Sequence, residues 1–302
     1  MPIAQLAGTT VGKPFRYKTL SIFPLSLPIV RHNGTRIADD TLEVSEVGGG
    51  VVGQLQVHNP GDVDLLIPAG RVLEGGRQTR TVNVSILVPA KKTLVIPVSC
   101  VEEGRWDLGT HFRNSGRYSS RRVRMAKERG VKANLDDHGG KESDQSVVWE
   151  SIDDELCLRR IVSPSSLYLS VDHYIDESDE LTEILREALA VGIQPGQTGV
   201  ALAHGGVVLG MELFTSEDDL RASWEALVRM AILDTETEAD ASGDVTERDI
   251  ERFLAEVASM ETTTVGGTGL GTEYHAADEH TVAHALVDDD GNLIHAFAFA
   301  SA

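Results

Sequence analysis

The sequence has little of what marks several special classes of protein. Its 302 residues include two cysteines, Cys100 and Cys157, too far apart in the chain to suggest a disulfide framework, which favours reduced thiols in a cytoplasm. No apolar run reaches about 18 residues, so no membrane span is expected. The opening stretch MPIAQLAGTT lacks a basic start followed by an apolar run, and it predicts no secretory signal peptide. These absences together indicate a cytoplasmic protein.

Basic side chains are outnumbered: 27 Lys and Arg stand against 47 Asp and Glu, a formal net charge of −20. The excess of acidic groups lies in the later part of the chain. Residues 1–132 hold 19 basic and 11 acidic groups, whereas residues 133–302 hold 8 basic and 36 acidic groups. We interpret this as a salt-adapted, halophilic-like acidic protein whose charge serves solubility. Few aromatic residues accompany the basic segment and the acidic remainder would repel phosphate, so we expect no nucleic-acid partner.

Regular apolar patterning is present, and it predicts an α+β protein. Residues 1–106 have the pattern of a β-rich domain, an antiparallel sheet or sandwich, because short runs such as TLEVSEV and DVDLLIP alternate with Gly- and Pro-containing turns. Residues 107–145 form a basic connector or arm, either a mobile solvated segment or a lid that closes on an anionic ligand. Residues 146–302 form an α+β portion that either stands alone or packs with the first as one unit.

The α+β portion is expected to contain three helices and two hairpins. Ser178, Ser216 and Thr246 each precede a stretch with a helical apolar stripe, and each suits the N-cap position. The hairpins turn at Gly205-Gly206 and at Asp290-Gly291.

A polar stretch leads into an apolar strand at QTRTVNVSILV, residues 78–88. If this strand is regular, Gln78 and Arg80 share a face with the apolar Val82, because side chains alternate along a strand. A buried Arg needs a partner. Gly75 and Gly76, just upstream, suit a bulge or the close approach of a ligand to the backbone.

The next strand, LVIPVSCVEEGRW, places Cys100 and Glu102 on its apolar face in the same way. A hairpin turning at residues 89–92 would bring the start of one strand to the end of the other. That pairing puts Arg80 near Val101 and Gln78 near Glu103.

Two interpretations of this cluster stay open. In one, an internal ion pair, Arg80–Glu102 or Arg105–Glu74, fixes the end of the sheet. In the other, the cluster is an anion-binding pocket: Arg80 and Arg105 are bidentate donors, Trp106 is a stacking wall, and Glu74 or Glu102 is the acid or base. Cys100 is a weaker candidate nucleophile, since a Cys among Val residues is more often an inert core thiol.

Histidines gather near the C-terminus at His275, His280 and His284. The segment HTVAHALV alternates like a strand, which separates His280 from His284 by about 13 Å, too far for one metal ion. The GGTGLG segment at 266–271 follows no clear strand, so it is a weak dinucleotide signal. We therefore assign no metal and no cofactor, and the role of the histidine cluster stays open.

Several stretches resemble a known family: IFPLSLP (22–28), GRVLEGGRQTR (70–80), VNVSILVPA (82–90), IPVSCVEEGRW (96–106) and DQSVVWESI (144–152). They are similar to the domain of unknown function named for its association with ADP-ribosylglycohydrolase and rhodanese-phosphatase proteins. The resemblance covers most of the chain and is clearest over 15–155. It departs at Thr79, where the family typically has Asn. It implies functional positions at Glu74, Gly75, Gln78, Arg80, Asn83, Cys100, Glu102, Arg105, Trp106, Gln145 and Trp149.

The association in the family's name suggests a role near NAD or ADP-ribose metabolism. The first hypothesis is an intracellular enzyme or binding protein for a small, phosphorylated, nucleotide-derived anion. Its ligand would meet Gly75, Gly76, Gln78, Arg80, Asn83, Arg105, Trp106, Gln145 and Trp149. The alternative is a non-catalytic structural or interaction module, in which the cluster is an internal ion-pair network and the protein forms a homo-oligomer. The sequence does not decide whether the protein is an enzyme.

Overall fold

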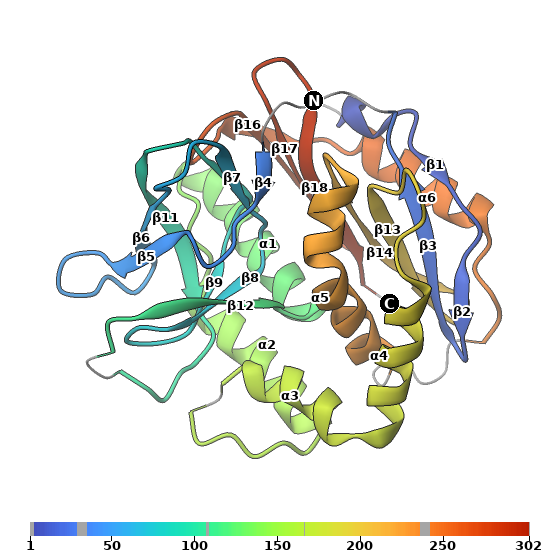
Figure 1. The fold of residues 1–302 in the computed structure, drawn as a ribbon, viewed down its shortest axis with the longest axis horizontal. Coiled ribbons are helices and arrows are strands. Elements are labelled where there is room, and N and C mark those ends of the chain that lie inside the picture. Colours follow the sequence, from blue (N-terminus) through green and yellow to red (C-terminus); the bar gives the residue numbers. More distant parts are fainter. Residues whose placement is uncertain (1–2, 29–34, 107–108, 166, 236–241, 302) are drawn as a thin grey trace. The chain divides into compact units, whose positions relative to one another are not determined.

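A computed structural model describes residues 3–28, 35–106, 109–165, 167–235 and 242–301. The described chain is an α+β protein with six α-helices and 18 strands, and every strand pair but one is antiparallel among the pairings assigned (Figure 1). It divides into two compact units. Unit 1 comprises residues 1–33, 178–265 and 272–302, and unit 2 comprises residues 34–177 and 266–271.

These boundaries differ from the three sections expected from the sequence. Strand β3 (Leu20–Ser26) pairs with β13 (Gly199–His204), so the N-terminal segment completes the sheet of the C-terminal part. Unit 2 is therefore an insertion between β3 and the fourth helix. Residues 266–271 join unit 2 through a bridge between Leu87 and Leu270. Both pairings link residues far apart in the chain, and such links leave no mark on local apolar patterns.

Unit 1 is built on one antiparallel sheet in the order β1-β3-β13-β14-β18-β17-β16-β15, with β2 also pairing with β3. The remaining strands of this sheet are β1 (Thr10–Val11), β2 (Phe15–Tyr17), β14 (Val207–Phe214), β15 (Thr263–Gly266), β16 (Thr272–Ala277), β17 (Thr281–Val287) and β18 (Leu293–Ala300). The expected hairpins are confirmed: β13 and β14 turn at Gly205-Gly206, and β17 and β18 turn around Asp290-Gly291.

Helices cover both faces of this sheet, and the three expected helices are confirmed. On one face, α6 (Glu247–Ser259) and the short 3₁₀ helix η1 (Ala4–Leu6) pack on small side chains of the sheet, which include Ala201, Ala283, Ala285, Ala296 and Ala298. On the other face, α5 (Glu217–Thr235) contacts β3, β13 and β14, and α4 (Asp179–Val191) packs on α5. Ser178, Ser216 and Thr246 each accept a hydrogen bond from the backbone of the following helix.

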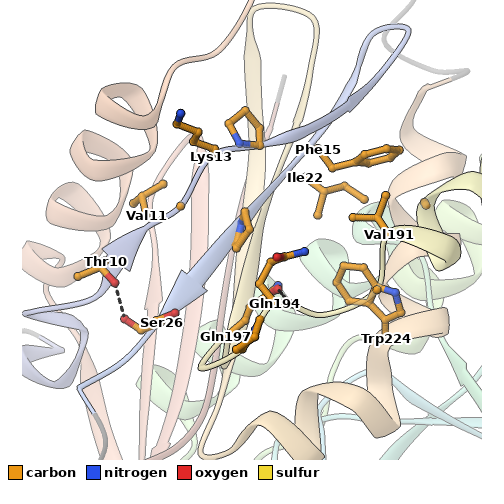
Figure 2. A pocket seen from close by; sticks show the side chains of 16 residues that line it. Thr10, Val11, Lys13, Phe15, Ile22, Ser26, Val191, Gln194, Gln197 and Trp224 are labelled. Carbon is orange, nitrogen blue, oxygen red and sulfur yellow. Dashed lines mark hydrogen bonds between the residues drawn. The ribbon is translucent and has the colours of Figure 1, made fainter.

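Unit 1 also has a cavity of about 510 Å³, a volume typical of small-molecule sites (Figure 2). Phe15, Ile22 and Trp224 contribute apolar walls, and Lys13 is the one charged side chain among the residues that line it. The indole Nε1 of Trp224 is buried without a hydrogen-bond partner among the described residues. The lining thus offers shape and apolar surface but no acid–base pair.

Unit 2 contains two smaller sheets. One has the order β12-β8-β9-β11-β6-β5, and the other has the order β10-β7-β4. The strands are β4 (Thr35–Ile37), β5 (Glu43–Glu46), β6 (Gln54–His58), β7 (Asp64–Ile67), β8 (Arg71–Gly75), β9 (Arg80–Val82), β10 (Ile86–Val88), β11 (Thr93–Cys100) and β12 (Phe112–Tyr118).

The stretch 78–88 is not the single regular strand that its alternation predicts. β9 pairs with β11, whereas β10 pairs with β7 in the other sheet, and the chain changes sheet at residues 83–85. Every residue from Gln78 to Val88 is buried, so both faces of the stretch are covered. The polar side chains of Thr81 and Ser85, on the other side of the stretch, face hydrogen-bond partners. Ser119 donates to Thr81, and the backbone N–H of Ala69 donates to Ser85.

The basic segment is ordered structure where it is described. It forms β12 and then α1 (Arg121–Asp137), followed by α2 (Gln145–Leu158) and α3 (Leu169–Glu177). Three of its basic side chains, Arg121, Arg124 and Lys127, are buried rather than solvated. Residues 107–108 of this segment lie outside the described residues. Within the described chain, no helix is both long and apolar enough to cross a bilayer.

Candidate functional site

The pairing of β9 with β11 brings the predicted residues together. Arg80 lies opposite Cys100, one residue from the predicted position opposite Val101. Beyond the strand ends, the backbone N–H of Val101 donates to the carbonyl of Thr79, and the amide of Gln78 donates to the carbonyl of Glu103 at 3.3 Å. The start of one strand therefore meets the end of the other, as the sequence predicts.

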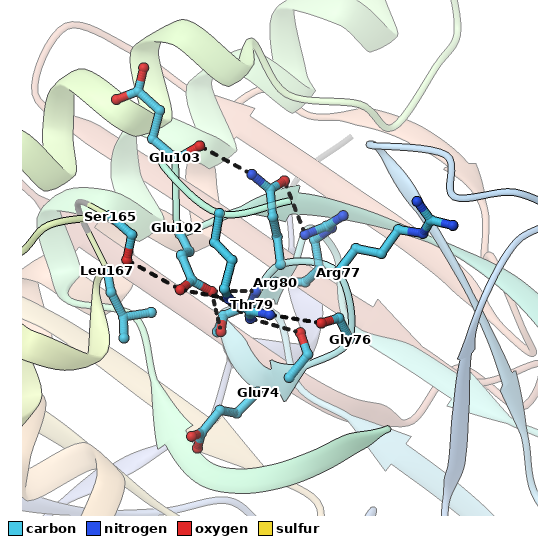
Figure 3. Close-up of polar contacts among 12 residues, drawn as sticks. Glu74, Gly76, Arg77, Thr79, Arg80, Glu102, Glu103, Ser165 and Leu167 are labelled. Carbon is cyan, nitrogen blue, oxygen red and sulfur yellow. Dashed lines mark hydrogen bonds and ion pairs between the residues drawn. The ribbon is translucent and has the colours of Figure 1, made fainter. Parts of the chain in front are cut away.

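Glu102 is the centre of the polar network at this edge (Figure 3). Its Oε2 accepts hydrogen bonds from the backbone N–H and the hydroxyl of Thr79, each at 3.1 Å. Arg105 donates to both carboxylate oxygens, from Nε at 2.9 Å and from Nη2 at 2.7 Å. The hydroxyl of Ser165 donates to Oε1 at 3.2 Å. The carboxylate therefore anchors three chain segments.

The electrostatics of Glu102 follow from these donors. Burial by itself raises the pKa of this carboxyl, but the hydrogen bonds from Arg105 and Thr79 outweigh it and hold the pKa below the ordinary value of 4.5. Glu102 is thus ionised at neutral pH and acts as an acceptor. This state does not favour a role as general acid, and its occupied oxygens do not favour a role as base.

Gly75 and Gly76 present their carbonyl groups to the same arginine. Nη1 of Arg105 donates to the carbonyl of Gly76 at 2.9 Å, and Nη2 donates to that of Gly75 at 3.3 Å. Both glycines have positive φ, +110° and +55°. A Cβ would lie 2.3 Å from the backbone oxygen of His111 at Gly75, and 2.0 Å from Cζ of Phe112 at Gly76. Glycine is therefore required for this turn.

Arg80 differs from Arg105 in its partners. Its side chain is 0% exposed, and Nη1 donates to Oε1 of Gln78 at 3.4 Å. Among the described residues, Nε and Nη2 of Arg80 have no hydrogen-bond partner. These two nitrogens form the guanidinium edge with which Arg105 holds Glu102 and Arg113 holds Glu74. The edge that fits an oxyanion in two parallel hydrogen bonds is thus unfilled at Arg80.

The surroundings of Arg80 compensate its charge only in part. Burial lowers the pKa of the guanidinium, whereas Glu46 and Glu102 raise it, and the overall direction is downward. Arginine stays charged in proteins, so the lowered pKa reflects a buried cation that is compensated only in part, rather than a neutral side chain.

Trp106 forms an aromatic wall beside two arginines. The Cζ atom of Arg80 lies 5.7 Å from its ring centroid, and that of Arg77 lies 5.5 Å away, so both make cation–π contacts. Trp106 is 46% exposed. A Cβ at Gly50 would lie 3.2 Å from Trp106 and 2.9 Å from Arg77, so the glycine-rich loop at 48–50 closely approaches both.

Cys100 is held in the core of unit 2. Its backbone N–H donates to Oε1 of Gln145 at 2.7 Å, and Nε2 of Gln145 donates back to the carbonyl of Cys100 at 2.8 Å. Burial raises the pKa of the thiol to about 11, so the protonated form dominates at neutral pH. Because the thiolate is the nucleophile, these surroundings favour the structural interpretation of Cys100.

Three of the candidates have other contacts. Glu74 forms a bidentate pair with Arg113 at 2.8 and 2.9 Å, not with Arg105. Asn83 is buried, accepts a hydrogen bond from Ser99 at 2.8 Å and donates to the carbonyl of Lys141 at 3.1 Å, which fixes the point where the chain changes sheet. The indole Nε1 of Trp149 is buried without a hydrogen-bond partner among the described residues.

Sequence reasoning missed several members of the site. Arg77 precedes the strand and was not distinguished from other surface arginines, and Ser165 lies far along the chain. Glu46 accepts a hydrogen bond from the backbone N–H of Arg77 at 2.9 Å, and its Oε2 is buried without a partner in the described part of the chain. The GGG run at 48–50 was the available signal for Glu46, because a glycine-rich loop permits close packing.

Fold and site define a two-unit α+β protein with an arginine-rich polar cluster at a strand edge of unit 2. Residues 8–299 match the family model described as ARG and Rhodanese-Phosphatase-superfamily-associated Protein domain. The chain belongs to this family, which has no established function and is associated by name with ADP-ribosylglycohydrolase and rhodanese-phosphatase proteins. No curated protein and no solved structure matches the chain.

Proposed function

We propose that unit 2 binds a phosphorylated, nucleotide-derived small molecule at Arg80. The observation that carries this proposal is the unfilled Nε–Nη2 edge of a fully buried guanidinium. A buried cation whose charge the described residues compensate only in part is costly, and a phosphate oxygen pair on this edge would offset that cost. Bidentate contacts of this kind also persist in concentrated salt, where diffuse charge attraction is screened.

The neighbours of Arg80 support a nucleotide-derived ligand over a bare anion. Trp106 is partly exposed and lies beside the guanidinium, and aromatic rings stack well on nucleobases. Gln78 adds an amide that touches Arg80 and can orient it. The family's associated proteins are named for ADP-ribose chemistry, which makes ADP-ribose and NAD the first ligands to test.

The polar groups around Arg80 favour binding over catalysis. Both candidate acid–base carboxylates, Glu102 and Glu74, are engaged by Arg105 and Arg113. The network of Glu102 then has a supporting role, since it fixes the backbone of residues 76–79 from which Gln78 and Arg80 extend.

Isothermal titration and thermal shift with ADP-ribose, NAD, AMP and inorganic phosphate test this proposal. At a ligand concentration 100-fold above Kd, a true ligand should stabilise the wild-type protein by about 2.7 kcal/mol. Arg80→Met and Arg80→Lys should both lose the response, because Lys keeps the charge but not the bidentate edge. Arg113→Gln, which removes an exposed arginine from unit 2, should keep it.

Stability separates binding from the structural alternative. If Arg80 serves a ligand, Arg80→Met removes a buried charge that is compensated only in part, and the unfolding free energy of the ligand-free protein should stay equal or rise by about 1–2 kcal/mol. A loss of several kcal/mol together with no response of wild type to any of the four compounds would contradict the proposal. That outcome, with a stable homo-oligomer, would favour the non-catalytic interaction module.

A further inference from the structure

Five titratable side chains share one face of the sheet of unit 1. Glu212 is on β14, Glu273 and His275 are on β16, His284 is on β17 and His295 is on β18. The opposite face presents alanines to α6, so the alternation along each strand separates a small apolar face from this polar one. All five side chains are buried. Buried titratable groups are rare without a specific arrangement of partners, so their geometry is informative.

The strand register aligns the two central histidines. His275 lies directly opposite His284 on the neighbouring strand, and His284 lies opposite Phe297 on the next. From the sequence, His280 and His284 are expected to lie too far apart along one strand to share a metal ion, but cross-strand neighbours have Cβ atoms about 4.5–5.5 Å apart. The pairing across strands thus creates a histidine pair that spacing along the sequence does not reveal.

The two rings face each other through the same type of nitrogen. Nδ1 of His275 lies 3.4 Å from Nδ1 of His284, and the ring centroids are 4.7 Å apart with planes tilted by 58°. Two imidazole ligands of a tetrahedral ion, each about 2.0–2.1 Å from the metal, have nitrogens separated by about 3.3–3.4 Å. The observed separation matches that ligand-to-ligand distance.

Glu273 supplies the supporting contact that metal-binding histidines have. Its Oε2 lies 3.1 Å from Nε2 of His275. With an ionised Glu273 and a neutral His275, Nε2 of His275 carries the proton and its Nδ1 presents a lone pair toward His284. A ligating histidine almost always donates its second ring N–H to a carboxylate, a carbonyl or water in this manner.

We propose that His275 and His284 bind a divalent transition-metal ion through their Nδ1 atoms, with Glu273 as a positioning residue. Imidazole nitrogen favours Zn²⁺, Co²⁺, Ni²⁺ and Cu²⁺ over Mg²⁺ and Ca²⁺. A tetrahedral ion needs two further donors, and carboxylate or water oxygens are compatible with an imidazole pair. The pair is fully buried, so an ion would enter and leave the site slowly, and each titration point needs time to equilibrate.

Co²⁺ titration of the full-length, untagged protein after chelator treatment tests the site. Wild type should bind about one Co²⁺ ion per chain with a visible ligand-field band, and Zn²⁺ should displace it. His275→Gln and His284→Gln should lose the band. Glu273→Gln should weaken Co²⁺ binding about 10–100-fold while keeping the band at saturation.

His295 offers a matched control, because it is equally buried on the same face but lies 3.0 Å from Glu212. His295→Gln should bind Co²⁺ like wild type, and so should His280→Gln, which removes an exposed histidine.

If the buried variants fail to fold, ¹⁵N-histidine spectra of wild type with and without Zn²⁺ decide, since two Nδ1 signals should shift. Three results would each overturn the proposal: no Co²⁺ uptake by wild type, Nδ1 signals that do not shift, or full uptake by folded His275→Gln and His284→Gln. The pair would then be an N–H···N hydrogen bond.

Discussion

Arg80 and Arg105 lie at one strand edge and differ in what their guanidinium groups hold. Arg105 uses Nε and Nη2 for Glu102 and also donates to the carbonyls of the glycine turn. Arg80 has the same two atoms unfilled among the described residues. The first arginine stabilises the fold, and the second is the one we assign to a ligand. Sequence motifs give both residues equal weight, and only their contacts distinguish them.

Glu102 should make stability depend on pH in a defined direction. Its pKa in the folded state lies below 4.5, so its stabilising contribution is fully present above that value and is lost as the pH falls through the folded pKa. Glu102→Gln should lower the unfolding free energy at pH 7 by about 2–3 kcal/mol, because it leaves Arg105 without its charged acceptor. Urea unfolding from pH 7 to pH 3 should show this difference shrinking toward the acidic end.

Glu74→Gln is the comparison for this change. Glu74 also pairs bidentately with an arginine, but Arg113 is largely exposed, so the loss should stay below about 1 kcal/mol. A difference between Glu102→Gln and wild type that stays constant across the pH range would show that its ionisation is not what stabilises the network.

At the scale of elements, the turn at residues 75–76 connects β8 to the site. It follows the strand that carries Glu74 and leads directly to Gln78 and Arg80. Its two carbonyl groups face Arg105, so the turn geometry and the polar network support each other. A change of backbone here should therefore disturb both stability and the position of Arg80.

Gly76→Ala tests this link, with Gly48→Ala as the control. Both glycines have nearly the same φ, +55° and +56°, but a Cβ at Gly76 meets Phe112 at 2.0 Å, whereas nothing lies within 4 Å of one at Gly48. The backbone strain shared by both should cost about 1–2 kcal/mol. The clash should bring the loss at Gly76 to roughly 2–5 kcal/mol in urea unfolding. Equal losses would mean that Phe112 moves aside freely.

Local patterns predicted the elements of the second half well. Helix caps at Ser178 and Thr246 and glycine turns in both hairpins are short-range signals, and each was confirmed. The prediction of one regular strand over residues 78–88 was wrong. It relied on the alternation of Asn83 and Ser85 with apolar residues, but both polar side chains face buried hydrogen-bond partners rather than solvent. When both faces of a strand are buried, the alternation of polar and apolar residues no longer shows which face points to the core.

The candidate site was predictable to within one residue of strand register. The hairpin argument placed Arg80 near Glu102, and the structure pairs Arg80 with Cys100. Which arginine takes the carboxylate was not predictable, because that choice depends on side-chain geometry. The histidine pair was also hidden, since it requires the register of β16 against β17.

At the scale of the whole molecule, unit 2 is inserted between β3 and α4, so the compact units do not follow the three sections expected from the apolar pattern and the basic segment. The change from basic to acidic near residue 132 falls inside α1 of unit 2, not at a unit boundary. Charge therefore varies along the chain without following the compact units. The net charge of −20 is a property of the whole surface, and its effect on stability should be general.

Salt should stabilise the protein by weakening repulsion among its acidic groups. Raising KCl from about 0.1 M to about 1 M shortens the Debye length from about 10 Å to about 3 Å, which screens like charges spread over the surface. Exposed ion pairs such as Arg186–Glu183 are screened as well, but such surface pairs contribute little to stability. Because the chain has 47 acidic and 27 basic groups, the repulsion that salt removes should outweigh the ion-pair attraction that it removes. The midpoint of thermal unfolding should therefore rise by several degrees.

The same titration near pH 4.8, the sequence isoelectric point, is the control. Net repulsion is small there, so KCl should have little effect, whereas any general exclusion of salt from the surface would act at both pH values. Circular dichroism melts at low protein concentration measure both series. A midpoint that falls with KCl at pH 7 would contradict the salt-adapted interpretation, and an equal rise at both pH values would assign the effect to hydration rather than to charge.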